Sequence, residues 1–146
     1  MYVFGGKMAD GRLSNRLKVL VFMDQKPYKW MYPNVKGNTP IARFKHTMLY
    51  YQPLNILIMY AGRNDSLYER QGSFCLQDIR VLNLELMSWC PSASFGDSPS
   101  EPRCAHSACL FGNSMMIFGG MSDSKISESV TYAVELSKSQ SIYIIL

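Results

Sequence analysis

The feature that most constrains the fold is an internal repeat. Short apolar runs end in a glycine at positions 6, 62 and 120, which are 56 and 58 residues apart. A tryptophan, an arginine and a histidine recur at a step of 59 or 60 residues. The recurring pairs are Trp30 with Trp89, Arg43 with Arg103, and His46 with His106. Because several independent landmarks share one period, the sequence predicts an array of similar supersecondary units.

The second repeat shows what one unit contains. Apolar runs at 46–51 and 56–60 are separated by the turn Pro53-Leu54-Asn55, and residues 79–84 alternate with the period of a half-buried strand. A tight turn at 85–87 leads to a short strand at 88–90. The third repeat has the same order, with runs at 106–110, 115–118, 129–136 and 142–146. No window carries a helical stripe, so the chain is predicted to be all-β.

In combination, these features resemble the kelch repeat. PIARFKH at 40–46 and PRCAH at 102–106 match its proline, arginine and histidine, and each precedes two apolar strands that end at the glycines. A strand with Tyr or Val and a tryptophan-bearing strand complete the pattern. The resemblance covers essentially the whole chain. It departs from the pattern at Ala61, which replaces a glycine, at SIYIIL, which lacks a tryptophan, and at the insertion 64–74.

The resemblance implies a β-propeller built from four-stranded antiparallel blades. We expect blade one, which lacks its first strand, at residues 1–35, blade two at 40–92 and blade three at 102–146. Propellers close with about four to eight blades, so we expect an incomplete ring with open apolar ends. We therefore expect further blades from a longer chain, or neighbouring chains, to cover these ends. Alone, the segment is expected to aggregate or to unfold with weak cooperativity.

The glycines could cradle a phosphate or end a strand. Phosphate binding requires a helix that begins just after the glycines, but Met121-Ser122-Asp123 leads toward another strand. A glycine after an apolar strand allows positive φ and a close approach between blades. We therefore interpret the glycines as structural repeat positions, namely Gly5, Gly6, Gly62, Gly119 and Gly120.

The repeated side chains have functional alternatives, but their shared register favours structure. Both histidines could bind a metal or act as bases, yet each occupies the same place in its repeat. The arginines are expected to tie loops together by hydrogen bonds to carbonyls or carboxylates, with ligand contact as the alternative. The tryptophans are expected to pack between blades, with partner contact as the alternative.

Composition narrows the class of protein. A content of 47% hydrophobic and 18% charged residues is that of a globular domain. The apolar runs are far shorter than the ~18 to 20 residues that cross a bilayer, and we expect no signal peptide, because the first residues lack its pattern. We expect a cytoplasmic location, with cytoskeletal association as the finer alternative. The four cysteines lack zinc spacing and are expected to be reduced thiols in or near a core, so no metal or cofactor is predicted.

The long loops point to function. Because antiparallel strands alternate in direction, the loops at 7–14, 31–39, 63–74, 91–101 and 121–127 should emerge at one end of the blades, the long-loop face. Binding residues concentrate on long loops of a rigid scaffold. The candidate partner-binding residues are Lys7, Arg12, Tyr32, Lys36, Arg63, Asn64, Asp65, Tyr68, Arg70, Asp97, Glu101, Asp123 and Lys125.

The charges on this face favour a protein or peptide partner over nucleic acid. Basic and acidic side chains are balanced on it, whereas a nucleic-acid surface shows one sign in a stripe. The first 46 residues hold nine Lys or Arg and two Asp out of the total of 15 and 11. This excess suggests an acidic peptide near Arg12, Arg16 and Lys18, with an ordinary solvated surface as the alternative.

Three functions stay open from the sequence. The first is a non-catalytic interaction module, either an adaptor or a targeting domain, which the kelch resemblance most often implies. The second is an enzyme: a copper oxidase would need converging His and Tyr ligands, and two histidines give it little support. A related alternative is the kelch domain of a larger enzyme, such as a kelch-type phosphatase. The third is a structural component of a cytoskeletal or ciliary assembly.

Overall fold

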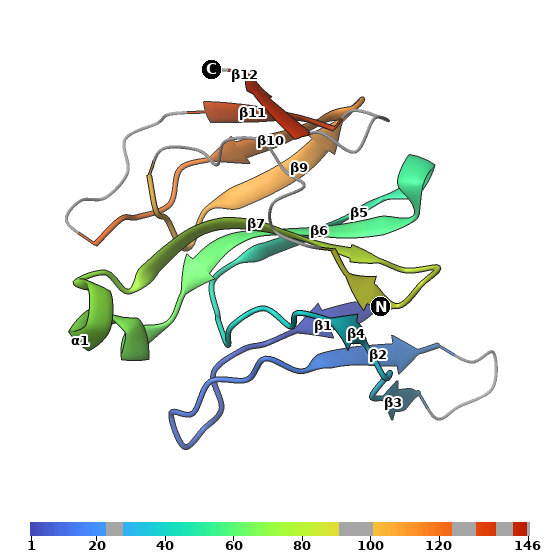
Figure 1. Ribbon diagram of the computed structural model, residues 1–146, viewed down its shortest axis with the longest axis horizontal. Coiled ribbons are helices and arrows are strands. Elements are labelled where there is room, and N and C mark those ends of the chain that lie inside the picture. The colour runs from blue at the N-terminus through green and yellow to red at the C-terminus, as the bar shows by residue number, and fades with distance from the viewer. Residues whose placement is uncertain (23–27, 91–100, 124–130, 137–141, 146) are drawn as a thin grey trace.

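The computed structural model places three β-sheets side by side along an arc (Figure 1). It describes residues 1–22, 28–90, 101–123, 131–136 and 142–145. Each sheet comes from one sequence repeat, apart from a short strand at 36–37 that joins the second sheet, and we call the sheets blade one, blade two and blade three in chain order. The described residues form no closed ring, so the prediction of an all-β, incomplete propeller is confirmed.

Blade one has three antiparallel strands in the order β1-β2-β3. They are β1 (Tyr2–Phe4), β2 (Leu17–Val21) and β3 (Lys29–Met31). The register pairs Phe4 with Leu17 and Val19 with Met31. Since β1 ends at the first glycine pair, it corresponds to the second strand of blade two. The described part of blade one therefore offers no counterpart to the first strand of blade two.

Blade two has five strands in the order β4-β8-β7-β6-β5. After β4 (Lys36–Gly37) come β5 (Thr47–Tyr51), the 3-10 turn η1 (Gln52–Leu54), β6 (Ile56–Arg63), β7 (Cys75–Asn83) and β8 (Ser88–Trp89). β6 continues to Arg63 across a register shift between Tyr60 and Gly62, so β7 begins earlier than the alternation at Ile79 indicated. β4 joins β8 in parallel, an addition that the repeat did not predict.

Blade three has four antiparallel strands in the order β12-β11-β10-β9. They are β9 (Ser107–Phe111), β10 (Ser114–Phe118), β11 (Thr131–Leu136) and β12 (Ile142–Ile145). β9 and β10 are joined by a tight turn at Gly112 and Asn113, where Gly112 has a φ of +58°. The strand without a tryptophan therefore still occupies the outer, fourth position of its blade.

The core lies between neighbouring blades because the strands of blade two are apolar on both faces. Side chains alternate along a strand, so Leu57 and Met59 of β6 face blade one while Ile58 and Tyr60 face blade three. All four are at most 4% exposed. An uninterrupted apolar run thus covers two interfaces at once. Each such side chain contributes about 1.5 to 3 kcal/mol of burial free energy.

Loops and turns separate to opposite ends of the blades (Figure 1). The loops at 5–16, 64–74 and 119–123 lie at one end, and the tight turns at 52–55, 84–87 and 112–113 lie at the other, the short-turn face. The insertion after β6 contains the 3-10 turn η2 (Asp65–Leu67) and the helix α1 (Tyr68–Gln71). α1 has only four residues, so it could not produce a helical stripe in the sequence.

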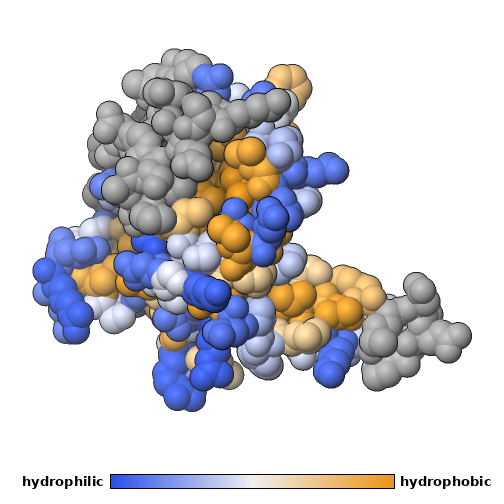
Figure 2. All heavy atoms as spheres, turned by 45° about the vertical axis from the view of Figure 1, so that its right-hand side comes forward, coloured by the Kyte–Doolittle hydropathy of each residue, from blue (hydrophilic) through white to orange (hydrophobic). Residues whose placement is uncertain are grey.

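The outer faces of the first and last blades are open. Trp89 is 3% exposed between blades one and two, but Trp30 is 47% exposed. The expectation that Trp30 packs between blades is therefore wrong for this chain, because no described residue covers that face of blade one. On blade three, Phe111 and Phe118 are 79% and 53% exposed. Figure 2 shows that apolar surface is exposed on blade one.

The cysteines differ in their surroundings. All four are free thiols, with Cys75 and Cys104 buried, Cys90 half-buried and Cys109 exposed. Burial raises the pKa of the Cys75 thiol. The expectation of a core position is wrong for Cys109, because it pairs with Met116 on the face of β9 that points away from blade two. None of the described helices has the length and apolar character that crossing a membrane requires.

Candidate interaction surface

Equivalent hydrogen bonds lie beneath the long loops at both junctions between neighbouring blades, and we call each set of bonds a joint. The backbone N–H of Gly6 donates to the carbonyl of Arg43 in the next blade at 2.8 Å, and Gly62 donates to Arg103 in the same way at 3.0 Å. Each arginine also reaches back within its own blade. Nη1 of Arg43 donates to the carbonyl of Ala61 at 2.9 Å, and Nη1 of Arg103 donates to that of Gly119 at 3.0 Å.

The glycines allow backbone segments to approach closely, between two blades at Gly5 and within blade three at Gly120. A Cβ on Gly5 would lie 2.4 Å from the Arg43 carbonyl oxygen, and a Cβ on Gly120 would lie 2.7 Å from that of Cys104. Gly5 has a φ of +68°, and Ala61, which replaces the first glycine in blade two, adopts a φ of +54°. The backbone geometry of this position is therefore kept even where the residue departs from the repeat.

The two arginines differ in how their charge is balanced. Arg43 is fully buried, and its Nη1 and Nη2 donate to Asp78 at 2.6 and 2.9 Å. Arg103 is 1% exposed and lies over the ring of Tyr132, with 4.4 Å between the guanidinium carbon and the ring centroid. Both side chains are enclosed between strands, so neither presents its guanidinium to a partner.

The two histidines are packing residues in equivalent places. His46 meets Phe4 edge-on at 6.0 Å between centroids, and His106 meets Tyr60 in the same way at 5.1 Å. Burial, followed by the charge of the adjacent arginine, lowers the pKa of each imidazole to about 4. Nε2 of His106 also hydrogen-bonds Oγ1 of Thr47 across the blade junction at 2.8 Å.

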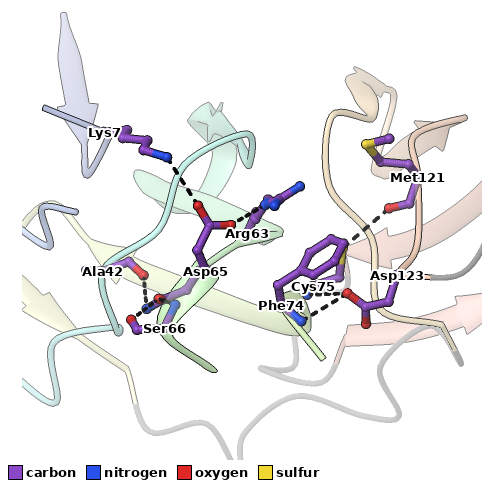
Figure 3. A network of polar contacts seen from close by, with 10 residues as sticks. Lys7, Ala42, Arg63, Asp65, Ser66, Phe74, Cys75, Met121 and Asp123 are labelled. Carbon is purple, nitrogen blue, oxygen red and sulfur yellow. Dashed lines mark hydrogen bonds and ion pairs between the residues drawn. The ribbon is translucent and has the colours of Figure 1, made fainter. Parts of the chain in front are cut away.

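A polar network holds the long loops together (Figure 3). Asp65 lies between Lys7 of blade one and Arg63 of its own blade, with 3.2 Å to the Lys7 ammonium. Hydrogen bonding with Arg63 is the largest cause that lowers the pKa of Asp65. Arg63 also lies over the ring of Phe74, at 4.0 Å from its centroid. The network thus joins the loops of blades one and two.

Two of the predicted partner-binding residues use their side-chain polar atoms in hydrogen bonds within the protein. Asn64 is 7% exposed; its side chain accepts from Ser66 N at 3.0 Å and donates to the Ala42 carbonyl at 2.8 Å. Oδ1 of Asp123 accepts from the backbone N–H groups of Phe74 and Cys75, at 3.0 and 3.2 Å, and so links blades two and three. Asn64 is therefore corrected from a binding to a structural residue, because its polar atoms are already paired and buried.

One other predicted residue, Lys36, lies away from the long loops. Lys36 is in β4, pairs with Ser88 and donates its backbone N–H to Met87, which places it at the short-turn face. Its assignment to the long-loop face is wrong because the parallel pairing with β8 draws this segment to the start of that strand. Tyr32 lies beside the long loop of blade one, where it lines a cavity with residues 5–8 and 12–16, and the Lys18 ammonium lies 6.0 Å from its ring centroid. Asp97 and Lys125 lie outside the described residues.

The remaining candidates keep side chains that a partner can reach. Lys7, Arg12, Arg70 and Glu101 are exposed, and Tyr68 is 58% exposed beside Phe74. Arg12 is paired locally with Asp10 at 2.7 Å. Among the residues that the structure describes, no group of three His, Cys, Asp or Glu side chains could hold a metal.

Sequence reasoning missed Phe44 and Lys45. Phe44 is half-buried, and Lys45 is exposed with a φ of +56°. They occupy the positions of Cys104 and Ala105 in the next repeat, and Ala105 has nearly the same φ of +55°. The signal that could have found them is this difference: a large aromatic and a charged residue stand where the repeat requires neither.

Comparison with known proteins gives consistent matches. A family model described as the KLHDC2/KLHL20/DRC7 Kelch-repeats domain matches residues 1–144. A probable serine/threonine-protein kinase of Dictyostelium discoideum is 35% identical over 82% of the chain, and dynein regulatory complex subunit 7 of Chlamydomonas reinhardtii is 31% identical over 82%. The chain spans only 8% and 10% of these two proteins.

A solved structure shows the same fold. The structure of YjhT superimposes with a TM-score of 0.70 at 15% identity, over 99% of this chain and 42% of that chain. Identity this low supports the fold alone. Kelch domains generally mediate protein–protein interactions. Since the family model spans nearly every residue and the repeated glycines, arginines and histidines form equivalent joints, this chain belongs to the kelch-repeat family, in the group described as KLHDC2/KLHL20/DRC7.

Proposed function

We propose that this chain is a non-catalytic interaction module that binds a protein or peptide partner through its long-loop face. The observation that carries the proposal is that exposed charged and aromatic side chains gather where buried bonds hold the loops in place. Tyr68 and Arg70 stand on α1, which directly follows the 3-10 turn η2, and the buried Asn64 caps the start of η2. Positioned side chains lose less conformational freedom on binding, which favours affinity.

The histidine chemistry supports a non-catalytic role. A general acid or base works best with a pKa near the operating pH. The pKa of both histidines is about 4, and both rings pack edge-on against an aromatic neighbour. Their place in the repeat is accounted for by packing.

A structural role in a cytoskeletal or ciliary assembly is the second candidate. It is favoured by the similarity to dynein regulatory complex subunit 7 of Chlamydomonas reinhardtii. In that case the protein would be cytoplasmic and associated with the cytoskeleton. The similarity to a probable protein kinase favours a further variant, in which these blades are the targeting part of a larger enzyme.

The test compares the two faces in the full-length protein. Tyr68→Ala and Arg70→Glu change exposed residues of the long-loop face, and Leu86→Ser changes a residue that is 66% exposed on the short-turn face. We expect affinity-purified partners to be lost with the first two variants and retained with the third. Equal retention or equal loss would contradict the proposal. Changes at Asn113 are unsuitable controls, because its side chain accepts a hydrogen bond from Tyr51 at 2.8 Å.

A further inference from the structure

Three cations surround the ring of Phe44 on the long-loop side of blade two. The Lys7 ammonium lies 5.4 Å from the ring centroid, and the Lys45 ammonium and the Arg63 guanidinium carbon each lie 5.9 Å from it. We call these four residues the Phe44 cluster. Cations within about 6 Å of an aromatic face are attracted to it, so the ring gathers charges that would otherwise repel one another.

The charge of the cluster is only partly balanced. Asp65 is the one carboxylate that pairs with it among the described residues, through Lys7 and Arg63. Only Nε of Arg63 is recorded in that pairing, so Nη1 and Nη2 remain as donors for a further acceptor in the described part of the chain. Lys45 has no recorded carboxylate partner there. One negative charge therefore faces three positive ones.

The fold does not require two members of the cluster, Phe44 and Lys45. The backbone bond that holds Lys45, from Ala105 N to the Lys45 carbonyl at 2.9 Å, uses no side-chain atom. In blade three the equivalent positions are Cys104 and Ala105, and Ala105 adopts the same backbone conformation. Phe44 and Lys45 therefore add an aromatic surface and a charge to a frame that is complete without them.

A groove adjoins the cluster. A cavity of about 440 Å³ lies between the loops of blades one and two, and Arg12, Ala42, Asp65 and Ser66 line part of its wall. Asp65 belongs to both the groove wall and the ion pairs of the cluster. An extended peptide on the cluster would thus have space to continue, with Arg12 as a further cation.

We propose that the Phe44 cluster binds an acidic peptide segment of the partner, with neighbouring carboxylates accepting from Lys7, Lys45 and Arg63 and apolar side-chain atoms contacting the Phe44 ring. This rests on the proposed interaction function and names the chemistry of its partner. A peptide fits better than nucleic acid, because the cations form one compact group with a carboxylate inside it. A nucleic-acid strand needs a row of phosphate contacts without interspersed acids.

The first experiment measures binding of a labelled hexaglutamate peptide to the full-length protein at physiological salt. We expect saturable binding that Lys45→Gln weakens at least fivefold and that Lys7→Gln combined with Lys45→Gln abolishes. Phe44→Leu keeps an apolar side chain but removes the aromatic ring, and we expect an intermediate loss. Far-UV circular dichroism on each variant shows that the loss does not come from unfolding.

Lys36→Gln is the matched control, since it removes one exposed lysine at the short-turn face. We expect it to change peptide affinity by less than twofold. Equal weakening by Lys36→Gln and Lys45→Gln would show that binding depends only on the net charge of the protein, and this would overturn the proposal. Tighter binding of a hexanucleotide, or no binding of hexaglutamate, would overturn it too. If the native partner is lost with Tyr68→Ala but kept with Lys45→Gln, this inference fails while the proposed function stands.

Discussion

The two blade junctions share the same backbone hydrogen bond but differ in the side-chain contacts that hold the blades together. Both have the glycine-to-arginine hydrogen bond and an aromatic ring edge-on to the next histidine. The junction of blades two and three adds side-chain bonds from His106 to Thr47, from Tyr51 to Asn113 and from Asp123 to the start of β7. The junction of blades one and two has instead an exposed ion pair, Lys7 with Asp65, and the packing of Phe4 on Trp89 at 5.4 Å.

The difference follows from the first strand. Thr47 and Tyr51, which supply two of the cross-links, belong to β5, the first strand of blade two. Blade one has no described counterpart of β5, and no hydrogen bond to the His46 ring is recorded among the described residues. The repeated joint therefore sets the spacing of blades, while the first strand decides whether a junction gains buried polar bonds.

The largest expected effect is that of Trp89→Ala. Removal of a buried tryptophan from a core typically costs about 3 to 5 kcal/mol of unfolding free energy. Trp30→Ala is the matched variant, and we expect about 1 kcal/mol or less because its side chain is 47% exposed. Urea unfolding measures both. Equal losses would show that another chain or blade covers Trp30 in solution, and loss of a partner without loss of stability would make Trp89 a contact residue.

Acid should weaken both junctions. Burial lowers the pKa of His46 and His106 to about 4, below the value of about 6.5 expected for the unfolded chain. The unfolded state thus takes up protons first as the pH falls. Stability is complete above about pH 6.5 and is lost progressively down to about pH 4.

We expect this loss to be roughly 2 to 3 kcal/mol in total, after allowance for solvent screening of the partly exposed rings. Thermal unfolding between pH 7.5 and 5 measures the part of this loss that occurs before most carboxylates titrate. His106→Gln should roughly halve the pH dependence. A flat stability profile in this window would mean that the rings are solvated and titrate normally.

A comparison of Gly5 with Gly119 separates the cost of crowding between blades from the cost of backbone strain. Gly5 and Gly119 have φ values of +68° and +65°, so alanine is strained at both by about 1 kcal/mol. Only Gly5 faces the next blade, where a Cβ would lie 2.4 Å from the Arg43 carbonyl oxygen. We expect Gly5→Ala to cost roughly 1 to 3 kcal/mol more than Gly119→Ala in thermal unfolding. Equal costs would show that the first junction yields without strain.

The smallest expected effect tests the polar bond that the first junction lacks. Thr47→Val keeps the shape of the side chain but removes Oγ1, the partner of His106 Nε2. We expect a loss of about 1 kcal/mol. Thr131→Val, on an exposed position of β11, should be close to neutral. If the two variants were equal, the bond from Thr47 to His106 would contribute nothing to the second junction.

Much of the fold was predictable because it depends on local patterns. The turn at 53–55 and the glycines at strand ends are found where the repeat predicted them. β4 was not predictable, since Lys36 and Gly37 carry no strand pattern and gain their pairing only from the exposed edge of β8. α1 was missed for a similar reason, because four residues cannot show a helical period.

The candidate surface was less predictable than the fold. The end of the blades that carries the loops follows from strand direction, but the role of each side chain depends on its neighbours. Asn64 looks like an exposed loop residue in the sequence, yet its hydrogen bonds to Ala42 and Ser66 bury it. Arg63 was predicted on this face, but its position over Phe74 could not be read from their separation in the chain.

The sequence by itself determined the repeat, the order of strands, the glycine turns and the side of the blades on which long loops emerge. These properties depend on residues close together in the chain or on one period, and alternation of apolar side chains records them directly. Only the tertiary structure decided which side chains meet. Phe44, Lys7 and Arg63 come from three separate segments, and their gathering depends on how two blades stack. Stacking is a sum of many weak contacts between distant segments, and no local pattern encodes it.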